Sequence, residues 1–210
     1  QPKGLLLDEP LSALDLKLRQ HRRTELRAIQ QQVGITFIYI THDQGEALTM
    51  SDRIAVMSDG VIQQVAGGKA VYDQPDTPFV ASFVGENNPF AGKIIAADGE
   101  QAVVETAHGP LRGRNPQGLK AGDRAILFVR PESFRLGAGA ADATLAAETL
   151  SSAFEGNATH VFLKGSTKKD ITVTVGRHGA SRIPAQGEMA HIHYDPGMGI
   201  VLPEGKMARE

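Results

Sequence analysis

Two adjacent carboxylates are the first residues of this chain with evident chemical potential. Asp8 and Glu9 directly follow the apolar stretch Gly4–Leu7, which we interpret as a buried strand of a parallel sheet. Ligands of α/β proteins bind at the carboxyl ends of such strands, and two neighbouring acids repel each other unless a cation or a proton compensates them. One carboxylate could hold Mg²⁺ on a nucleotide while the other orients or deprotonates a water. Taken alone, the pattern fits equally well two acids that cap the following helix.

The elements around these acids follow from periodicity and capping residues. Residues 15–33 place apolar side chains on one face and Arg and Gln on the other, which predicts a helix with Gly34 as its C-cap. Ile35–Ile40 is β-branched and aromatic and indicates a second buried strand. Asp43 is predicted to be the N-cap of a helix that runs to Met50. His42 therefore follows the second strand as Asp8 follows the first.

The composition and the pattern of apolar residues divide the remaining chain into two parts. A hairpin is predicted around Ser58-Asp59-Gly60, with short helices near 69–73 and 79–83. Beyond Gly85 the chain is rich in glycine and in short alternating runs, which favours a small barrel or sandwich; the Ala-rich segment 138–147 is interpreted as a loop or an edge. We therefore expect an α/β segment over residues 1–84 and an all-β domain over residues 85–210. The expected strands of that domain are Gly92–Ala96, Ala102–Thr106, Ala125–Val129, His160–Leu163, Ile171–Val175, Met189–Tyr194 and Gly199–Leu202.

Composition excludes several classes of protein. The 210 residues carry a net charge of -2, which argues against a nucleic-acid or membrane-surface binder held by bulk electrostatics. The chain has no cysteine, so disulfides and thiolate metal sites are excluded. No apolar run approaches the roughly 20 residues that a membrane helix needs.

Three ordered motifs resemble the ATP-binding subunits of ABC transporters. Residues 5–10 (LLLDEP) are similar to the Walker B motif of that family, Ser12-Ala13-Leu14-Asp15 to its D-loop, and His42 to the switch histidine of its H-loop. The continuation through residues 44–57 is similar to the importer branch. The resemblance implies that residues 1–84 are part of an ABC-type P-loop NTPase domain.

The resemblance also implies roles for individual residues, with ATP and Mg²⁺ as cofactors. Asp8 would contact Mg²⁺, usually through water, and Glu9 would be the general base that positions the attacking water. His42 would hydrogen-bond the γ-phosphate; the alternative is an ordinary histidine at a strand end. Asp15 would cross a dimer interface and couple two ATP sites, a role compatible with capping the helix that begins at Leu16.

The phosphate-binding loop of the family is not found in this sequence. No Gly-Lys pair is followed by Ser or Thr, since Lys69, Lys93 and Lys206 precede Ala, Ile and Met. The signature and glutamine-loop motifs, which precede Walker B in the family, are also absent. We therefore interpret the chain as a C-terminal fragment, with a processed N-terminus as the alternative. The fragment alone should not hydrolyse ATP, and unpaired strand edges should favour self-association.

The second half resembles the TOBE accessory domain, an OB-like barrel that follows the ATPase domain in several importers. The residues that carry this resemblance are Arg130-Pro131-Glu132, Phe134-Arg135-Leu136, Phe154–Asn157 and Tyr194-Asp195-Pro196. They are most similar to the variant of polyamine and ferric-iron importers.

These resemblances predict the C-terminal part of the ATP-hydrolysing subunit of an ABC importer. The expected solute is a polyamine such as spermidine or putrescine, with ferric iron, sulfate or sugars as alternatives. The expected partners are a second ATPase subunit in a homodimer, integral membrane permease subunits and, indirectly, a periplasmic or surface solute-binding protein, with no nucleic acid. The expected location is the cytoplasmic face of a bacterial inner membrane. The alternative function is a non-catalytic module in which the β domain senses a small molecule and residues 1–84 mediate assembly.

Overall fold

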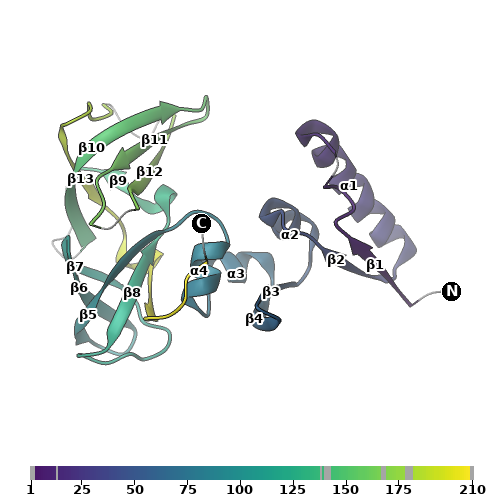
Figure 1. Cartoon of the computed structure of the whole chain (residues 1–210), viewed down its shortest axis with the longest axis horizontal. Coiled ribbons are helices and arrows are strands. Elements are labelled where there is room, and N and C mark those ends of the chain that lie inside the picture. Colours follow the sequence, from purple (N-terminus) through teal and green to yellow (C-terminus); the bar gives the residue numbers. More distant parts are fainter. Residues whose placement is uncertain are drawn as a thin grey trace. The chain divides into compact units, whose positions relative to one another are not determined.

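The chain forms two compact units, Gln1–Pro75 and Asp76–Glu210, which are described one at a time. The computed structural model describes residues 3–12, 14–137, 139, 143–166, 169–177 and 182–208 (Figure 1). Ala13 of the predicted D-loop and residues 138 and 140–142 of the Ala-rich segment lie outside the described residues.

The first unit begins with a strand, a helix and a parallel strand. Strands β1 (Gly4–Asp8) and β2 (Thr36–Ile40) pair in parallel and are connected through α1 (Leu16–Val33). Helix α1 starts where Oδ1 of Asp15 accepts the N–H of Leu18 at 2.9 Å, and it ends at Gly34 with φ 68, a left-handed conformation that glycine adopts without strain. Helix α2 (Gln44–Met50) is capped in the same way by Asp43. These two predicted helices and the predicted caps Asp15, Gly34 and Asp43 are confirmed.

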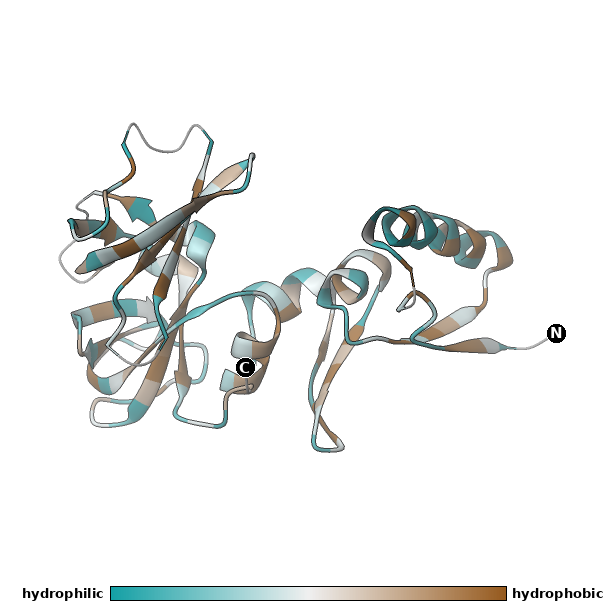
Figure 2. Ribbon diagram, turned by 45° about the horizontal axis from the view of Figure 1, so that its top comes forward, coloured by the Kyte–Doolittle hydropathy of each residue, from teal (hydrophilic) through white to brown (hydrophobic). Residues whose placement is uncertain are grey.

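The prediction that the first two strands are buried is wrong for this chain. Leu6 and Ile38 face each other across the β1–β2 pair and are 63% and 58% exposed. Figure 2 shows hydrophobic residues along both strands. A two-stranded sheet has too few neighbouring elements to cover its apolar side chains. Apolar residues that are typical of a buried strand are therefore exposed to solvent here.

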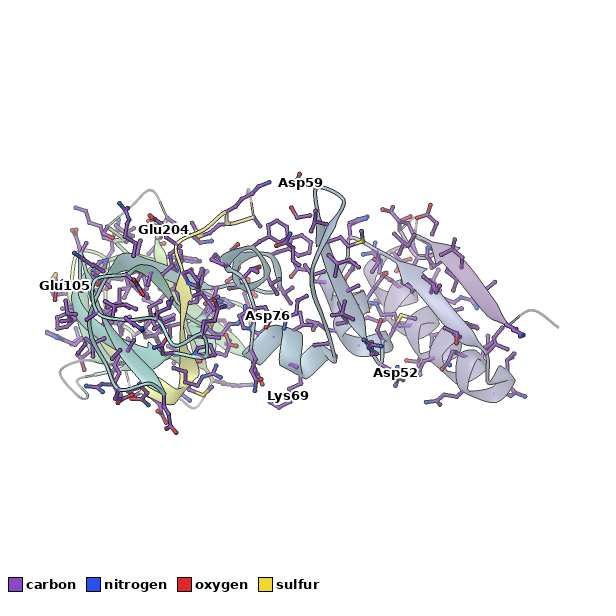
Figure 3. The ribbon with its side chains drawn as sticks, turned by 90° about the horizontal axis from the view of Figure 1, so that it is seen from below. Asp52, Asp59, Lys69, Asp76, Glu105 and Glu204 are labelled. Atoms are coloured by element: carbon purple, nitrogen blue, oxygen red, sulfur yellow. The ribbon has the colours of Figure 1, made fainter. Side chains whose placement is uncertain are left out.

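A hairpin and a short helix complete the first unit. Strands β3 (Ile54–Ser58) and β4 (Val61–Ala66) pair antiparallel around the predicted turn, and Asp59 lies at its tip (Figure 3). Helix α3 (Gly68–Asp73) follows, and Nε2 of Gln64 donates to the carbonyl of Gln74 just after the helix at 2.9 Å. That bond fixes the end of α3 against β4.

The second unit contains a closed five-stranded barrel in the order β14-β7-β6-β5-β8. Its strands are β5 (Asn88–Ala97), β6 (Gln101–Thr106), β7 (Gly109–Arg114), β8 (Arg124–Val129) and β14 (Gly199–Pro203). Strand β8 is apolar on both faces: Leu127 joins the main core, while Phe128 packs with Ala81 of helix α4 (Pro78–Phe83). Helix α4 therefore belongs to the second compact unit, although the sequence placed it before the boundary at residue 84; that domain boundary stays a prediction.

A five-stranded antiparallel sheet packs with the barrel in the order β12-β11-β10-β13-β9. Its strands are β9 (Arg135–Leu136), β10 (Thr144–Phe154), β11 (Ala158–Leu163), β12 (Ile171–Gly176) and β13 (Met189–His193), with 3₁₀ turns η1 (Pro131–Ser133) and η3 (Pro196–Met198) at its connections. Residues 144–147 were expected in a loop or an edge strand. They form the start of β10, where the strand pairs with β13 alone, whereas β11 pairs with β10 only from Thr149 onward. The strand was hard to predict from the sequence, because only Leu145 among these four residues has a large apolar side chain.

One buried side chain joins the barrel to this sheet. The amide nitrogen of Asn88 on β5 donates to the carbonyl of Thr172 on β12 at 2.8 Å, and its amide oxygen accepts the N–H of Thr172 at 2.8 Å. The two layers share one apolar core that includes Phe90, Phe134 and Tyr194. The expected fold class, a small α/β part followed by a β-rich barrel domain, is confirmed. Among the described residues, no helix is long and apolar enough to cross a bilayer.

Candidate functional site

Glu9 and His42 lie side by side at the carboxyl ends of β1 and β2. Nδ1 of His42 donates to Oε1 of Glu9 at 3.0 Å. The parallel register sets Asp8 opposite Ile40, and the N–H of Glu9 donates to the carbonyl of Ile40 at 2.9 Å. Both side chains are exposed, so a ligand can reach them from solvent. The structure thus brings together the predicted base and the predicted switch histidine.

The backbone of Glu9 is in an unusual conformation. Its φ is 44, in the left-handed region that few residues other than glycine adopt. The N–H and the hydroxyl of Ser12 both donate to the carbonyl of Glu9, at 3.2 and 3.0 Å, and hold this turn in place. Backbone strain of this kind concentrates at functional sites, so the conformation of Glu9 supports a functional hypothesis for this turn.

Electrostatics favour a charged histidine here. The hydrogen bond and the negative charge of Glu9 raise the pKa of His42 above its ordinary value. The imidazolium form can donate from both ring nitrogens, so a histidine bound to Glu9 through Nδ1 still has a second donor for an anionic ligand.

Asp8 and Asp15 take different positions. Asp8 ends β1 with an exposed carboxylate, a hard oxygen donor of the kind that Mg²⁺ takes from one or two protein acids. Asp15 uses Oδ1 to cap α1. No group of three or more metal-binding side chains occurs in the described part of the chain. Asp8 therefore fits a single-carboxylate contact to a metal that is held mainly by other ligands.

The sequence analysis missed a polar cluster between α1 and α2. Arg19, Arg23 and Arg27 lie at intervals of four residues on one face of α1 and all bind groups at α2. Nη1 of Arg19 and Nη2 of Arg23 both donate to Oδ2 of Asp43, at 3.0 and 2.9 Å. The spacing was visible in the sequence, but these arginines were placed only on the face opposite the apolar side chains, with no partner predicted for them. Their periodicity matches a helix-facing row equally well.

Glu46 is the buried anion of this cluster and is 2% exposed. Its Oε2 accepts the hydroxyls of Thr41 and Tyr39 at 2.8 and 3.2 Å, and its Oε1 lies 3.9 Å from Nε of Arg19. Burial and the Glu46 carboxylate raise the pKa of Tyr39 well above its ordinary range. Burial also favours the neutral form of Asp43, but the N–H of Glu46 and the Arg19 guanidinium outweigh it and lower the pKa of Asp43.

Comparison with known proteins gives one family match and several similar proteins. Residues 127–202 match the family model of the TOBE domain. The spermidine/putrescine import ATP-binding protein PotA of Rubrobacter xylanophilus is 49% identical over 167 residues, which are 78% of this chain and 44% of that protein. The protein of the same name from Acidothermus cellulolyticus is 39% identical over 211 residues, which are 96% of this chain and 54% of that protein. The chain is homologous to part of an ABC transporter ATP-binding protein and contains a TOBE domain.

These matches confirm the resemblance drawn from the Walker B, D-loop and H-loop stretches to the ABC ATP-binding subunits. The chain spans about half the length of the curated relatives it matches. The cytoplasmic molybdate-binding protein ModG gives a TM-score of 0.47 at 17% identity and covers 54% of this chain and 94% of its own.

Proposed function

We propose that this chain is the C-terminal part of the ATP-hydrolysing subunit of an ABC importer, in which ATP binding and hydrolysis drive solute uptake. The observation that carries the proposal is the 3.0 Å contact between Glu9 and His42 at the ends of two parallel strands. The homology to ABC ATP-binding proteins supports it.

Each site residue has a proposed task. Glu9 accepts a proton from the water that attacks the γ-phosphate, and its turn fixes the direction of the carboxylate. Protonated His42 donates a hydrogen bond to an oxygen of that phosphate. Asp8 would contact a magnesium ion, which would supply positive charge to the phosphates, and Asp15 would lie at the interface with a second ATPase subunit.

The proposed solute is a polyamine. The curated relatives are named for spermidine/putrescine import, which supports this class over ferric iron, sulfate or sugars. The proposed assembly is a homodimer of ATPase subunits bound to membrane permease subunits on the cytoplasmic face of a bacterial inner membrane, served by a solute-binding protein. Because the sequence printed here has no Gly-Lys-Ser/Thr loop, this stretch alone should be inactive.

The substitution Glu9→Gln in the intact protein tests the proposal. It removes the base but keeps the size of the side chain, so ATP binding should persist while turnover falls at least on the order of 10²-fold. Steady-state ATPase assays and equilibrium binding of a fluorescent ATP analogue measure the two effects.

Glu25→Gln is the matched control, because Glu25 makes exposed ion pairs on α1 and should tolerate the same change. Normal turnover in Glu9→Gln would contradict the role of Glu9 and favour the non-catalytic alternative.

A further inference from the structure

We infer that Arg19 is a positioning residue that ties the turn of Glu9 to the helix start of His42. The inference rests on the proposed function, because it gives Arg19 a task in that same site. Nη1 of Arg19 donates to Asp43, while Nη2 donates to the carbonyl of Leu14 at 3.0 Å and reaches the carbonyl of Ser12 at 3.5 Å. One guanidinium therefore holds segments that are about thirty residues apart in sequence.

On one side, the contacts of Arg19 lead to the base. Ser12, whose carbonyl faces Nη2 of Arg19, donates both its N–H and its hydroxyl to the carbonyl of Glu9. The carbonyl of Leu11 accepts the N–H of Leu14 at 3.1 Å, which ties Leu14 to the residues beside the turn of Glu9. A shift of this segment would move the carbonyl of Glu9 and, with it, the left-handed backbone that aims the carboxylate.

On the other side, the contacts lead to the histidine. Asp43 directly follows His42; its Oδ1 accepts the N–H of Glu46, and its own N–H donates to the hydroxyl of Thr41 at 3.0 Å. The carboxylate that Arg19 binds is therefore the cap that fixes the backbone after His42, while the N–H of the same residue is bound to Thr41 before it. Besides the 3.0 Å contact between Glu9 and His42, the hydrogen bonds of Arg19 thus form a second connection between the two segments that carry these residues.

Arg23 provides a control within the same cluster. In the described structure it contacts the carboxylates of Asp43 and Glu46 but not the backbone carbonyl of Ser12 or Leu14. Arg19 and Arg23 lie one turn apart on α1, carry the same charge and share Oδ2 of Asp43. They differ in the link to the turn of Glu9.

A lysine at position 19 should preserve only part of the function of Arg19. The guanidinium offers five donors in a planar fork, whereas an ammonium is a compact point charge at the end of a flexible stem. Lysine at position 19 can bind Asp43 but is poorly shaped to hold Asp43 and the carbonyl of Leu14 at once.

The test compares Arg19→Gln with Arg23→Gln in the intact protein. We expect Arg19→Gln to lower kcat on the order of 10- to 100-fold, with KM for ATP nearly unchanged, because misplacing a catalytic group by about 1 Å has effects of that size. Arg23→Gln should lower kcat less than Arg19→Gln does, because Arg23 shares the bond to Asp43 but lacks the bond to the carbonyl of Leu14. The rates are expressed per nucleotide site titrated with a fluorescent ATP analogue, so that loss of folded protein does not count as loss of kcat.

The remaining variants make every outcome decisive. Arg19→Lys should fall between wild type and Arg19→Gln, and if Arg19→Gln does not fold, the lysine variants of positions 19 and 23 carry the same comparison. Equal kcat values for the matched variants of positions 19 and 23 would overturn the role of Arg19. Glu9→Gln is measured in parallel: normal turnover there refutes the proposed function itself, whereas a slow Glu9→Gln with equal arginine variants refutes only this inference.

Discussion

The backbone conformation of Glu9 sets the direction of its carboxylate, and His42, which follows the next strand, is its hydrogen-bond partner. The left-handed φ of 44 turns the chain just after β1, and the hydroxyl of Ser12 holds the turn. A glycine at this position would relieve the strain but would also remove the carboxylate, so the site retains a residue that is costly for the backbone. The left-handed backbone of Glu9 and its hydrogen bond to His42 together determine where the carboxylate lies.

The pairing of His42 with Glu9 predicts a pH dependence. Because Glu9 raises the pKa of His42, the stabilisation from this pair is fully present below the ordinary histidine pKa and is lost as the pH rises through the raised value. Glu9→Gln should lower the pKa of His42 toward its ordinary value. An NMR titration of the histidine ring resonances of this chain measures the change.

The control for this titration is Glu105→Gln. Glu105 is an exposed residue of β6 and is not one of the acids that raise the pKa of His42, so its neutralisation should leave the titration of His42 unchanged. An unchanged His42 titration in Glu9→Gln would show that the 3.0 Å contact does not persist in solution.

Among the elements, those marked by a specific capping or turn residue were predictable. Asp15, Gly34 and Asp43 fixed the ends of α1 and α2 because each satisfies backbone groups that a helix leaves open. The turn of the hairpin around Asp59 was predictable for a similar reason, since left-handed positions favour few residue types.

Elements defined by distant partners were not predictable. Strand β7 contains two glycines and a proline among six residues and exists because β6 and β14 pair with it. Strand β10 is built largely from small residues, and its register is set by β11 and β13. In the site, the positions of Glu9 and His42 after the ends of two strands were predictable. The contacts of Arg19 were not, because they depend on how α1 packs against α2, which the local sequence pattern does not specify.

Close packing in the barrel predicts the effect of one added methyl group. A Cβ on Gly92 of β5 would lie 2.0 Å from the carbonyl oxygen of Glu105, so Gly92→Ala must displace the backbone of β6. We expect a loss of about 1–3 kcal/mol in the free energy of unfolding of the second unit. Urea unfolding followed by circular dichroism measures it, because the chain has no tryptophan to report by fluorescence.

Gly176→Ala is the matched substitution in the same unit. A Cβ at Gly176, the last residue of β12, would meet no heavy atom within 4 Å, so the cost should stay within roughly 0.5 kcal/mol. Equal losses for the two variants would show that β5 and β6 are not held as closely as the structure has them.

At the scale of the whole molecule, the first unit carries an exposed apolar surface. Leu6, Ile38 and Ile40 are all about half exposed or more on the β1–β2 sheet. Apolar strands without neighbours on both sides are templates for pairing with another chain.

This surface predicts self-association of the isolated chain. Sedimentation velocity over a range of concentrations should show oligomers, and Leu6→Lys combined with Ile38→Lys should shift the chain toward the monomer, because the two positions are opposite each other on the sheet. Phe154→Lys is the control, since Phe154 is 70% exposed at the end of β10. Equal shifts by the control and the double variant would locate the association elsewhere.

The barrel of the second unit has a consequence for the order of events on the ribosome. Strands β5 to β8 are synthesised first, but β14, which lies between β7 and β8, follows every strand of the second sheet. Until β14 emerges, β7 and β8 present unpaired edges while roughly seventy further residues are translated, at rates near 5–20 residues per second. The nascent chain therefore passes through several seconds with an open barrel, and chaperone contact would be most useful during that interval.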